Sequence, residues 1–422
     1  MTPSIDHGEE LYHMDSDADA VVIGSGALGL STAYHLARLG LEHVVVVDRC
    51  APASQTSPRA AGLFKLIQPD ETRTLLSRLS IDKVLRFEED TGVPLAVARS
   101  GSIMLARTAE HAALIEEDVE RSRSWGIDVE LIDPVEAHRL MPVLEAQGVR
   151  AACYTRGDVY IEEPSSLLNA YLEASARLGV RVVAHTAVTG VRLRAGEVAG
   201  VETNGGRIMA PVVVDAAGAW ARLVGRMAGI AIPVAPVRHQ LFITDPIAGV
   251  DSAQPILRIT DTAVYIRPAR GGLMLGGFEH DPLSLDPGTR SDGFSIDDVP
   301  LNMGVLEGLA GTVRDQVPAL RDAEIQEHRG GLFTMTPDGR FVVGPVPGAA
   351  GLWSATGCNG SGFSSSPAIG QLLAEWIVEG EPSIDLDILR PGRFDALDEA
   401  RLRDAGVWQY AHYYDPHASR PA

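Results

Sequence analysis

The feature that most constrains the fold is a glycine-rich turn between two short apolar segments near the start of the chain. Residues 18–23 predict a buried strand, and Gly24–Gly29, with the order Gly-Ser-Gly-Ala-Leu-Gly, follows it directly. Ala27–Leu39 has the apolar spacing of a helix, and His43–Val47 predicts a second strand that ends in Asp48. This order of strand, turn, helix and strand is one βαβ unit, so we expect an α/β fold with a parallel sheet.

Each part of this unit has a chemical use. Gly24 permits the tight turn, Gly26 lets the backbone approach a pyrophosphate, and Gly29 permits close contact between strand and helix. The helix N-terminus offers free N–H groups and a partial positive charge to phosphates. Asp48 can accept hydrogen bonds from ribose hydroxyls. We therefore expect a bound dinucleotide, and this fingerprint alone leaves NAD and FAD both open.

The remaining chain alternates between two kinds of pattern. A second α/β block covers residues 157–220, and alternating strands follow over 237–277. The α/β character returns after residue 329, where a glycine turn precedes a helix predicted over Pro367–Val378. The nucleotide-type segments are interleaved with the others, which predicts two domains that the chain crosses repeatedly.

Charge and cysteine content exclude several classes of function. The chain has 36 basic and 56 acidic residues, a net charge of −20, which would repel a nucleic acid backbone. No apolar run approaches the roughly 18 residues of a membrane span, and the acidic start resembles no targeting signal. Three widely spaced cysteines favour a cytoplasmic protein without disulfides. No metal-ligand spacing is present, so we expect no metal.

Five segments, spread over most of the chain, resemble the FAD-dependent D-amino acid oxidase superfamily in its sarcosine oxidase and dimethylglycine dehydrogenase branch. In chain order they are Gly24–Gly29, Ser57–Leu63 (Ser-Pro-Arg-Ala-Ala-Gly-Leu), Asp215–Trp220 (Asp-Ala-Ala-Gly-Ala-Trp), Thr334–Gly339 (Thr-Met-Thr-Pro-Asp-Gly) and Gly357–Phe363 (Gly-Cys-Asn-Gly-Ser-Gly-Phe). The resemblance covers about residues 18–391. It implies a Rossmann-type FAD-binding domain interleaved with an antiparallel-sheet substrate domain, of α+β type, whose sheet covers the flavin.

On this resemblance we divide the chain and assign its cofactor-binding residues. The expected parts are a flexible acidic tail (1–17), a discontinuous FAD-binding domain (18–90, 155–232 and 328–395), a substrate domain (91–154 and 233–327) and a C-terminal extension (396–422). The expected FAD-binding residues are Gly24, Gly26, Ala27, Leu28, Gly29, Asp48, Arg49, Ser57, Arg59, Ala60, Ala61, Gly62, Val188, Ala217, Gly218, Trp220, Gly331, Gly360, Gly362, Phe363 and Ser364. An ordinary glycine loop, a plain helix N-terminus or a core tryptophan would give the same residues at several of these positions.

The chain departs from the family pattern where the flavin is attached and where the reaction occurs. Relatives with covalent flavin use Cys or His where this chain has Gly331 and Arg59, so we expect dissociable FAD. Met274 replaces a lysine that activates oxygen in monomeric sarcosine oxidases, which favours a dehydrogenase. Ser364 replaces a lysine that binds the substrate carboxylate. The cations available to replace it are Lys65, Arg238 and Arg267.

The candidate catalytic residues are His239, Tyr265 and Arg267, in the strand region that would cover the flavin. A histidine with a pKa near neutrality can accept the proton of an amine, although buried strand residues of these types are more often structural. Lys65, Met274 and Arg238 are the candidate substrate-binding residues.

The resemblance implies oxidation of a C–N bond in a secondary or tertiary amine or an N-substituted amino acid. A hydride would pass to flavin N5, and the imine would then be hydrolysed. A dehydrogenase is favoured, with an unknown electron acceptor. A peroxide-forming amine or D-amino acid oxidase, an NAD-dependent dehydrogenase and a flavin subunit of a larger electron-transfer complex remain as alternatives.

Overall fold

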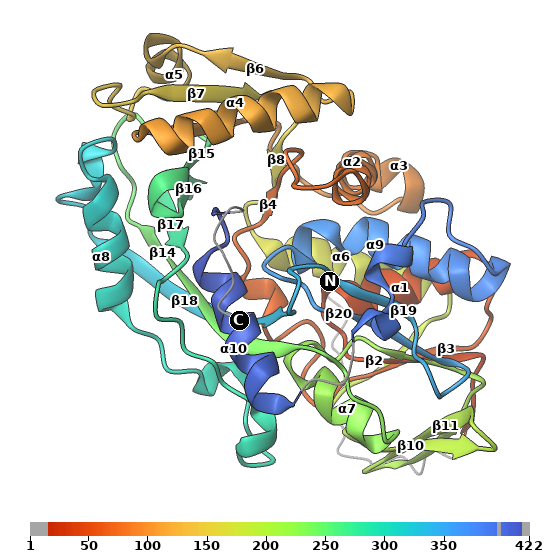
Figure 1. The fold of residues 1–422 in the computed structure, drawn as a ribbon. Helices are drawn as coiled ribbons and strands as arrows, with labels where there is room; N and C mark the ends of the chain where they lie inside the picture. The colour runs from red at the N-terminus through yellow and green to blue at the C-terminus, as the bar shows by residue number, and fades with distance from the viewer. Residues whose placement is uncertain (1–15, 395–397, 416–422) are drawn as a thin grey trace, which may run out of the picture.

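Two large sheets dominate the fold, as Figure 1 shows for a computed structural model that describes residues 16–394 and 398–415. The six-stranded sheet contains β2 (Ala20–Ile23), β3 (Val44–Val47), β9 (Arg181–Val183), β13 (Val212–Asp215), β19 (Val342–Pro345) and β20 (Leu352–Thr356). Their order across the sheet is β19-β20-β13-β2-β3-β9, and every neighbouring pair except β19–β20 is parallel. The βαβ unit expected from the glycine turn is therefore present.

The short valine-rich strands of this sheet are covered on both faces, which explains their continuous apolar sequences. Successive side chains of a strand point to opposite faces. Ala20 and Val22 belong to the core formed with the helices α1 (Ala27–Arg38) and α9 (Gly362–Glu379), whereas Val21 and Ile23 belong to a core on the opposite face. That opposite face carries α7 (Ala221–Met227) and a small sheet of β1 (Ser16–Asp17), β10 (Val188–Arg194), β11 (Glu197–Thr203) and β12 (Gly206–Met209).

The second sheet has eight strands and is antiparallel except at one pair. It contains β5 (Ser102–Ala106), β6 (Val129–Ile132), β7 (Ala151–Thr155), β14 (Ala235–Thr244), β15 (Ile256–Ile259), β16 (Val264–Ala269), β17 (Gly272–Gly277) and β18 (Ile325–Met335). The order is β18-β14-β17-β16-β15-β5-β7-β6, and only β5 and β15 run parallel among these neighbours. A mainly antiparallel substrate sheet beside a parallel nucleotide sheet confirms the predicted fold class.

Helices and short strands complete the described chain. The remaining elements are β4 (Leu63–Phe64), β8 (Val159–Tyr160), α2 (Glu71–Leu85), α3 (Phe87–Thr91), α4 (Ala109–Ser124), α5 (Pro134–Leu140), α6 (Pro164–Arg177), α8 (Met303–Val313) and α10 (Glu399–Ala411). Figure 1 shows α4 beside β6 and β7 at the top of the view, and α10 near β14 and β18, with which it is in contact.

Three predicted boundaries differ in the structure. Residues 328–335 were expected in the FAD-binding domain, but β18 pairs with β14 from Ala235 opposite Met335 to Thr244 opposite Ile325, so they belong to the substrate sheet. Helix α9 begins at Gly362 rather than at Pro367. The helix tolerates Pro367 in its interior at the loss of one backbone hydrogen bond. Ser16 and Asp17, assigned to the tail, pair with β12. Residues 1–15, 395–397 and 416–422 lie outside the described residues.

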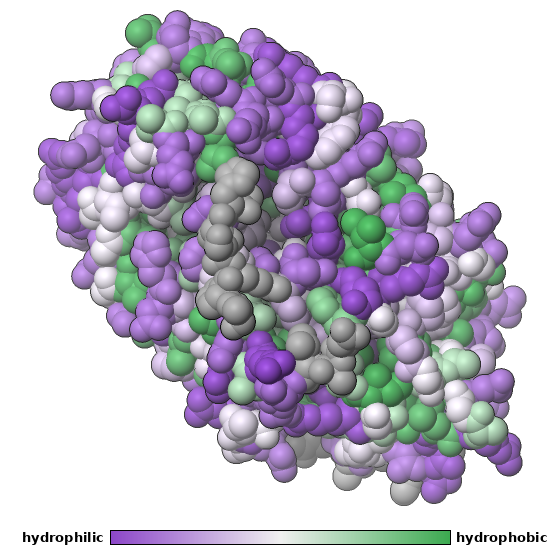
Figure 2. All heavy atoms as spheres, viewed as in Figure 1, coloured by the Kyte–Doolittle hydropathy of each residue, from purple (hydrophilic) through white to green (hydrophobic). Residues whose placement is uncertain are grey.

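The face shown in Figure 2 is mainly hydrophilic, with apolar side chains in scattered groups. Within residues 16–394 and 398–415, no helix has the length and apolar character needed to cross a membrane.

Candidate functional site

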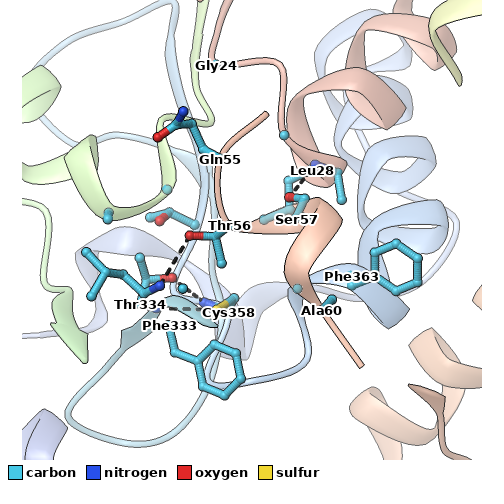
Figure 3. A pocket seen from close by; sticks show the side chains of 18 of the residues that line it. Gly24, Leu28, Gln55, Thr56, Ser57, Ala60, Phe333, Thr334, Cys358 and Phe363 are labelled. Atoms are coloured by element: carbon cyan, nitrogen blue, oxygen red, sulfur yellow. Dashed lines mark hydrogen bonds between the residues drawn. The ribbon is translucent and has the colours of Figure 1, made fainter. Parts of the chain in front are cut away.

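A cavity of about 700 Å³ lies between the two sheets and brings distant segments together. One end is lined by the Gly24–Leu28 turn and the other by residues of the eight-stranded sheet, including His239 and Tyr265. Figure 3 shows its middle, where the segment Gln55–Ala60 faces Phe333, Thr334 and Cys358. The site is therefore elongated, with a nucleotide-type turn at one end and aromatic side chains at the other.

The glycine turn has the close contacts that the sequence predicts. Gly24 has a φ of +102°, and a Cβ there would lie 2.6 Å from the carbonyl oxygen of Ala216. A Cβ on Gly29 would lie 1.9 Å from the carbonyl oxygen of Gly24, so helix α1 meets β2 too closely for any side chain. Gly26 faces the cavity, leaving its backbone open to a pyrophosphate. The hydroxyl of Ser57 accepts a hydrogen bond from the Ala27 N–H at 3.0 Å (Figure 3).

Asp48 also lines the cavity, and most of its hydrogen-bonding capacity holds the turn. Oδ2 accepts from the backbone N–H and the hydroxyl of Ser25, and Oδ1 accepts from the Cys50 N–H at 2.8 Å. A carboxylate has about four acceptor positions, so one remains for a ribose hydroxyl. Beside it, the Arg49 guanidinium lies 5.2 Å from the centre of the Trp220 ring, giving a flat cationic and aromatic wall.

The loop after β20 is fastened to β18 at the middle of the cavity. The Cys358 N–H donates to the hydroxyl of Thr334 at 2.8 Å, and the Thr334 N–H donates to Cys358 Sγ at 3.3 Å (Figure 3). The hydroxyl of Thr56 accepts from the Leu332 N–H at 3.2 Å and so joins the loop after β3 to the same strand. These contacts fix both loops against β18 of the eight-stranded sheet, beside the cavity.

A row of hydrogen-bonded rings forms the far end. His239 Nε2 lies 2.8 Å from the Tyr265 hydroxyl, and His239 Nδ1 lies 2.7 Å from the Tyr410 hydroxyl. The imidazole stacks on Phe333, with ring centres 4.3 Å apart. His239 is only 6 % exposed, and this burial lowers its pKa from 6.5 to about 3. The expected near-neutral pKa is therefore wrong: desolvation disfavours the protonated ring, so His239 is a weaker base than expected.

The lowered pKa of His239 predicts a loss of stability in acid. Between pH 6.5 and 3, His239 is protonated in the unfolded chain but not in the folded chain. The free energy of unfolding therefore falls as the pH falls. From pH 7 to pH 5 we expect the wild type to lose about 2 kcal/mol more than a His239→Gln variant. Urea unfolding of both proteins at the two pH values measures this difference. Equal losses would show that His239 titrates normally.

The structure brings most of the predicted residues to this cavity. All of the predicted FAD-binding residues except Gly29 line it, as do Lys65, His239 and Tyr265. Gly29 lies directly behind the turn, where its role is the close packing described above. Arg59 lines the wall, but its guanidinium forms an ion pair with Asp297 at 2.5 Å.

Three predicted residues lie outside the cavity, and their proposed substrate contacts need correction. The Arg238 guanidinium is buried in an ion pair with Glu279 at 3.0 Å. Arg267 is fully buried and donates to the carbonyl oxygens of Ala61 and Glu162, each at 2.8 Å, so it supports the loop under the cavity. Met274 packs in a small apolar cluster and does not reach the cavity surface. In each case the side chain already interacts with neighbouring protein groups and is not available to contact a substrate.

Sequence reasoning missed several residues of the wall. Arg258, Phe278, Phe333, Tyr413 and Tyr414 all line the cavity. Arg258 could have been found from the strand pattern, because it stands opposite Tyr265 in the β15–β16 hairpin. The two tyrosines follow α10, near the end of the chain, and no sequence motif marks them.

Comparison with known proteins assigns the family. A family model described as FAD dependent oxidoreductase matches residues 19–376. The chain belongs to this family. FAD is therefore the cofactor that the cavity must accommodate, and the open backbone at Gly26 and the free acceptor position of Asp48 fit it.

Individual members of the FAD-dependent oxidoreductase family match nearly the whole chain. Mitochondrial sarcosine dehydrogenase of Mus musculus is 30 % identical over 410 residues, which are 95 % of this chain and 44 % of the relative. Mitochondrial dimethylglycine dehydrogenase of Rattus norvegicus is 32 % identical over 396 residues, 92 % of this chain and 46 % of the relative. The chain thus spans about half the length of these curated relatives. Other relatives bear oxidase names.

A solved structure of the family agrees with the fold. L-proline dehydrogenase from P. horikoshii superimposes with a TM-score of 0.82 at 26 % identity, covering 90 % of this chain and 98 % of that one. The family and the fold inferred from the sequence are both confirmed.

Proposed function

We propose that this protein uses FAD to oxidise a C–N bond in a secondary or tertiary amine or an N-substituted amino acid. One observation carries the proposal: a continuous cavity joins the glycine turn to the hydrogen-bonded pair of His239 and Tyr265. The names of the similar sarcosine, dimethylglycine and proline dehydrogenases support this substrate class. The three free cysteines are compatible with the cytoplasm as its compartment.

Each part of the wall has a role in this reaction. Bound FAD would supply the acceptor for the substrate hydride. The Gly24–Gly29 turn would bind its pyrophosphate, and Asp48 would accept from a ribose hydroxyl. Tyr265 would contact the substrate nitrogen. Because His239 stays neutral, it orients the Tyr265 hydroxyl without taking a proton, and the pair selects the amine that has a free lone pair.

We also propose that the FAD is held without a covalent bond. Gly331 and Arg59 line the cavity at the positions where relatives with covalent flavin have Cys or His, and neither side chain can form that bond. Acid precipitation of the holoprotein should leave all of the yellow colour in the supernatant.

A dehydrogenase remains the favoured form of the enzyme, on the names of the similar sarcosine, dimethylglycine and proline dehydrogenases. Air readmitted to the reduced protein should reoxidise its flavin slowly. Rapid reoxidation with formation of peroxide would instead identify an oxidase.

Anaerobic bleaching of the bound flavin tests the function. Sarcosine, N,N-dimethylglycine, proline and simple amines are each added to the FAD-loaded protein, and the visible flavin absorption is followed. We expect at least one N-substituted amino acid to bleach it within seconds to minutes. A yellow protein that none of these compounds bleaches would contradict the proposed substrate class.

A further inference from the structure

We propose that Arg258 and Lys65 together bind the carboxylate of the substrate, beside Tyr265 at the sheet end of the cavity. The inference rests on the proposed function and makes it more specific. The carboxylate-binding lysine of monomeric sarcosine oxidases is replaced by Ser364. Of the three cations first considered, Arg238 and Arg267 are occupied elsewhere, whereas Lys65 lines the cavity. Arg258, which was not considered, lines it as well.

The position of Arg258 follows from the register of the sheet. Arg258 in β15 is paired with Tyr265 in β16, and residues directly opposite each other in antiparallel strands project from the same face. Both side chains line the cavity. Cβ atoms of such opposite pairs are about 5 Å apart. In an α-amino acid the nitrogen is two bonds from the carboxylate carbon, so a carboxylate held by Arg258 would bring the nitrogen next to Tyr265.

Arg258 is buried with unused hydrogen-bonding capacity. The residue is 3 % exposed, and its Nη1 has no hydrogen-bond acceptor among the described residues. Asp158 lies nearby, with Oδ2 3.5 Å from Nη1, too far for a good hydrogen bond. That carboxylate is already engaged, because Oδ1 accepts from the Leu66 N–H at 2.8 Å and Oδ2 accepts from the Ser102 hydroxyl at 2.6 Å.

Lys65 adds a second positive charge to the same place. Its Nζ lies 5.9 Å and 5.7 Å from the ring centres of Tyr413 and Tyr414, and within residues 16–394 and 398–415 it has no carboxylate partner within 4 Å. Burial lowers the pKa of Lys65, Tyr413 raises it and Arg258 lowers it. The Leu66 N–H, next to Lys65 in the chain, donates to the Asp158 carboxylate that pairs with Arg258, so the two cations belong to the same part of the cavity.

The charges at this end of the cavity do not balance. Lys65 and Arg258 lie near the buried carboxylate of Asp158, whereas the Asp118 carboxylate, which also acts on Lys65, is already paired with Arg121. A buried charge without a partner is unfavourable. One bound carboxylate would restore neutrality, and the planar guanidinium can hold it with two parallel hydrogen bonds. The chain should therefore prefer N-substituted amino acids to amines that lack a carboxylate.

Ligand binding to the FAD-loaded protein tests the carboxylate site without turnover. Acetate and its neutral isostere acetamide are titrated, and the change in flavin absorption gives each dissociation constant. Arg258→Met should weaken acetate on the order of 30-fold or more, as expected when one partner of a buried charge pair is removed. Arg258→Lys and Lys65→Met should weaken it less, and acetamide should bind alike to all variants. Arg107→Met is the matched control, since Arg107 pairs with Asp261 at 2.7 Å and does not line the cavity.

Two further measurements keep the outcomes distinct. Because Arg258→Met leaves Asp158 buried beside an apolar side chain, the double variant Arg258→Met/Asp158→Asn is also titrated, and acetate should remain weak there. In turnover, kcat/KM for N,N-dimethylglycine should fall strongly in Arg258→Met while that for trimethylamine stays the same. The proposed carboxylate site is overturned if the wild type and Arg258→Met bind acetate with equal affinity. It is also overturned if the wild type does not bind acetate. A protein that binds acetate but is not bleached by any amine would instead refute the proposed function alone.

Discussion

Replacing Gly29 with alanine is expected to give a protein that purifies without FAD. The new Cβ would lie 1.9 Å from the carbonyl oxygen of Gly24, and both atoms belong to the backbone, so no side chain can move aside. Helix α1 must then shift away from β2 and carry its free N–H groups out of place. Overpacking of this kind costs about 3 kcal/mol. If the turn distorts to remove the clash, this energy is lost from FAD binding, and the dissociation constant for FAD should rise roughly 100-fold. Calorimetric titration of apoprotein with FAD measures this change.

Gly308→Ala is the matched control for this substitution. Gly308 lies in helix α8, where a Cβ would meet nothing within 4 Å. Alanine there should bind FAD normally and raise the free energy of unfolding by about 0.5–1 kcal/mol, because it favours the helix. Wild-type FAD affinity in Gly29→Ala would show that the turn does not bind the dinucleotide.

The second large effect is expected for Tyr265→Phe, which should slow flavin reduction roughly 10²-fold with the best substrate. The variant keeps the ring but removes the hydroxyl that lies 2.8 Å from His239 Nε2 and would contact the substrate nitrogen. FAD affinity should not change. Stopped-flow measurement of the bleaching rate under anaerobic conditions tests this expectation.

Tyr410→Phe provides the comparison, because it removes the hydroxyl on the other side of His239, 2.7 Å from Nδ1. This variant should slow flavin reduction less than Tyr265→Phe. In the wild type the rate should follow the fraction of neutral amine and show no inflection near pH 6.5, since the pKa of His239 is about 3. Equal rates in wild type and Tyr265→Phe would remove Tyr265 from the reaction.

The nucleotide half of the molecule could be predicted because local sequence determines it. A buried parallel strand needs a continuous apolar run, and a turn in which helix and strand nearly touch tolerates only glycine at Gly24 and Gly29. Each requirement is met by neighbouring residues, so it leaves a readable pattern. Most of the predicted wall residues therefore line the cavity.

The substrate half was harder, because a charged residue's role depends on partners distant in sequence. Arg238 and Arg267 resemble free cations in the sequence, yet Glu279 and the carbonyl oxygen of Glu162 engage them in the fold. Arg258 looks like an ordinary strand residue until its register with Tyr265 is known. The pKa of His239 depends on burial by several elements, which no local pattern reports.

Three tyrosines, in the last turn of α10 and directly after it, have a consequence for how this enzyme can diversify. Tyr410 bonds to His239, and Tyr413 and Tyr414 line the cavity, yet all three lie beyond the last residue of the family match, at position 376. A few substitutions in this short segment could reshape the chamber while both sheets and the cofactor cradle stay untouched. New substrate preferences could thus evolve in this segment without changing the residues that stabilise the fold.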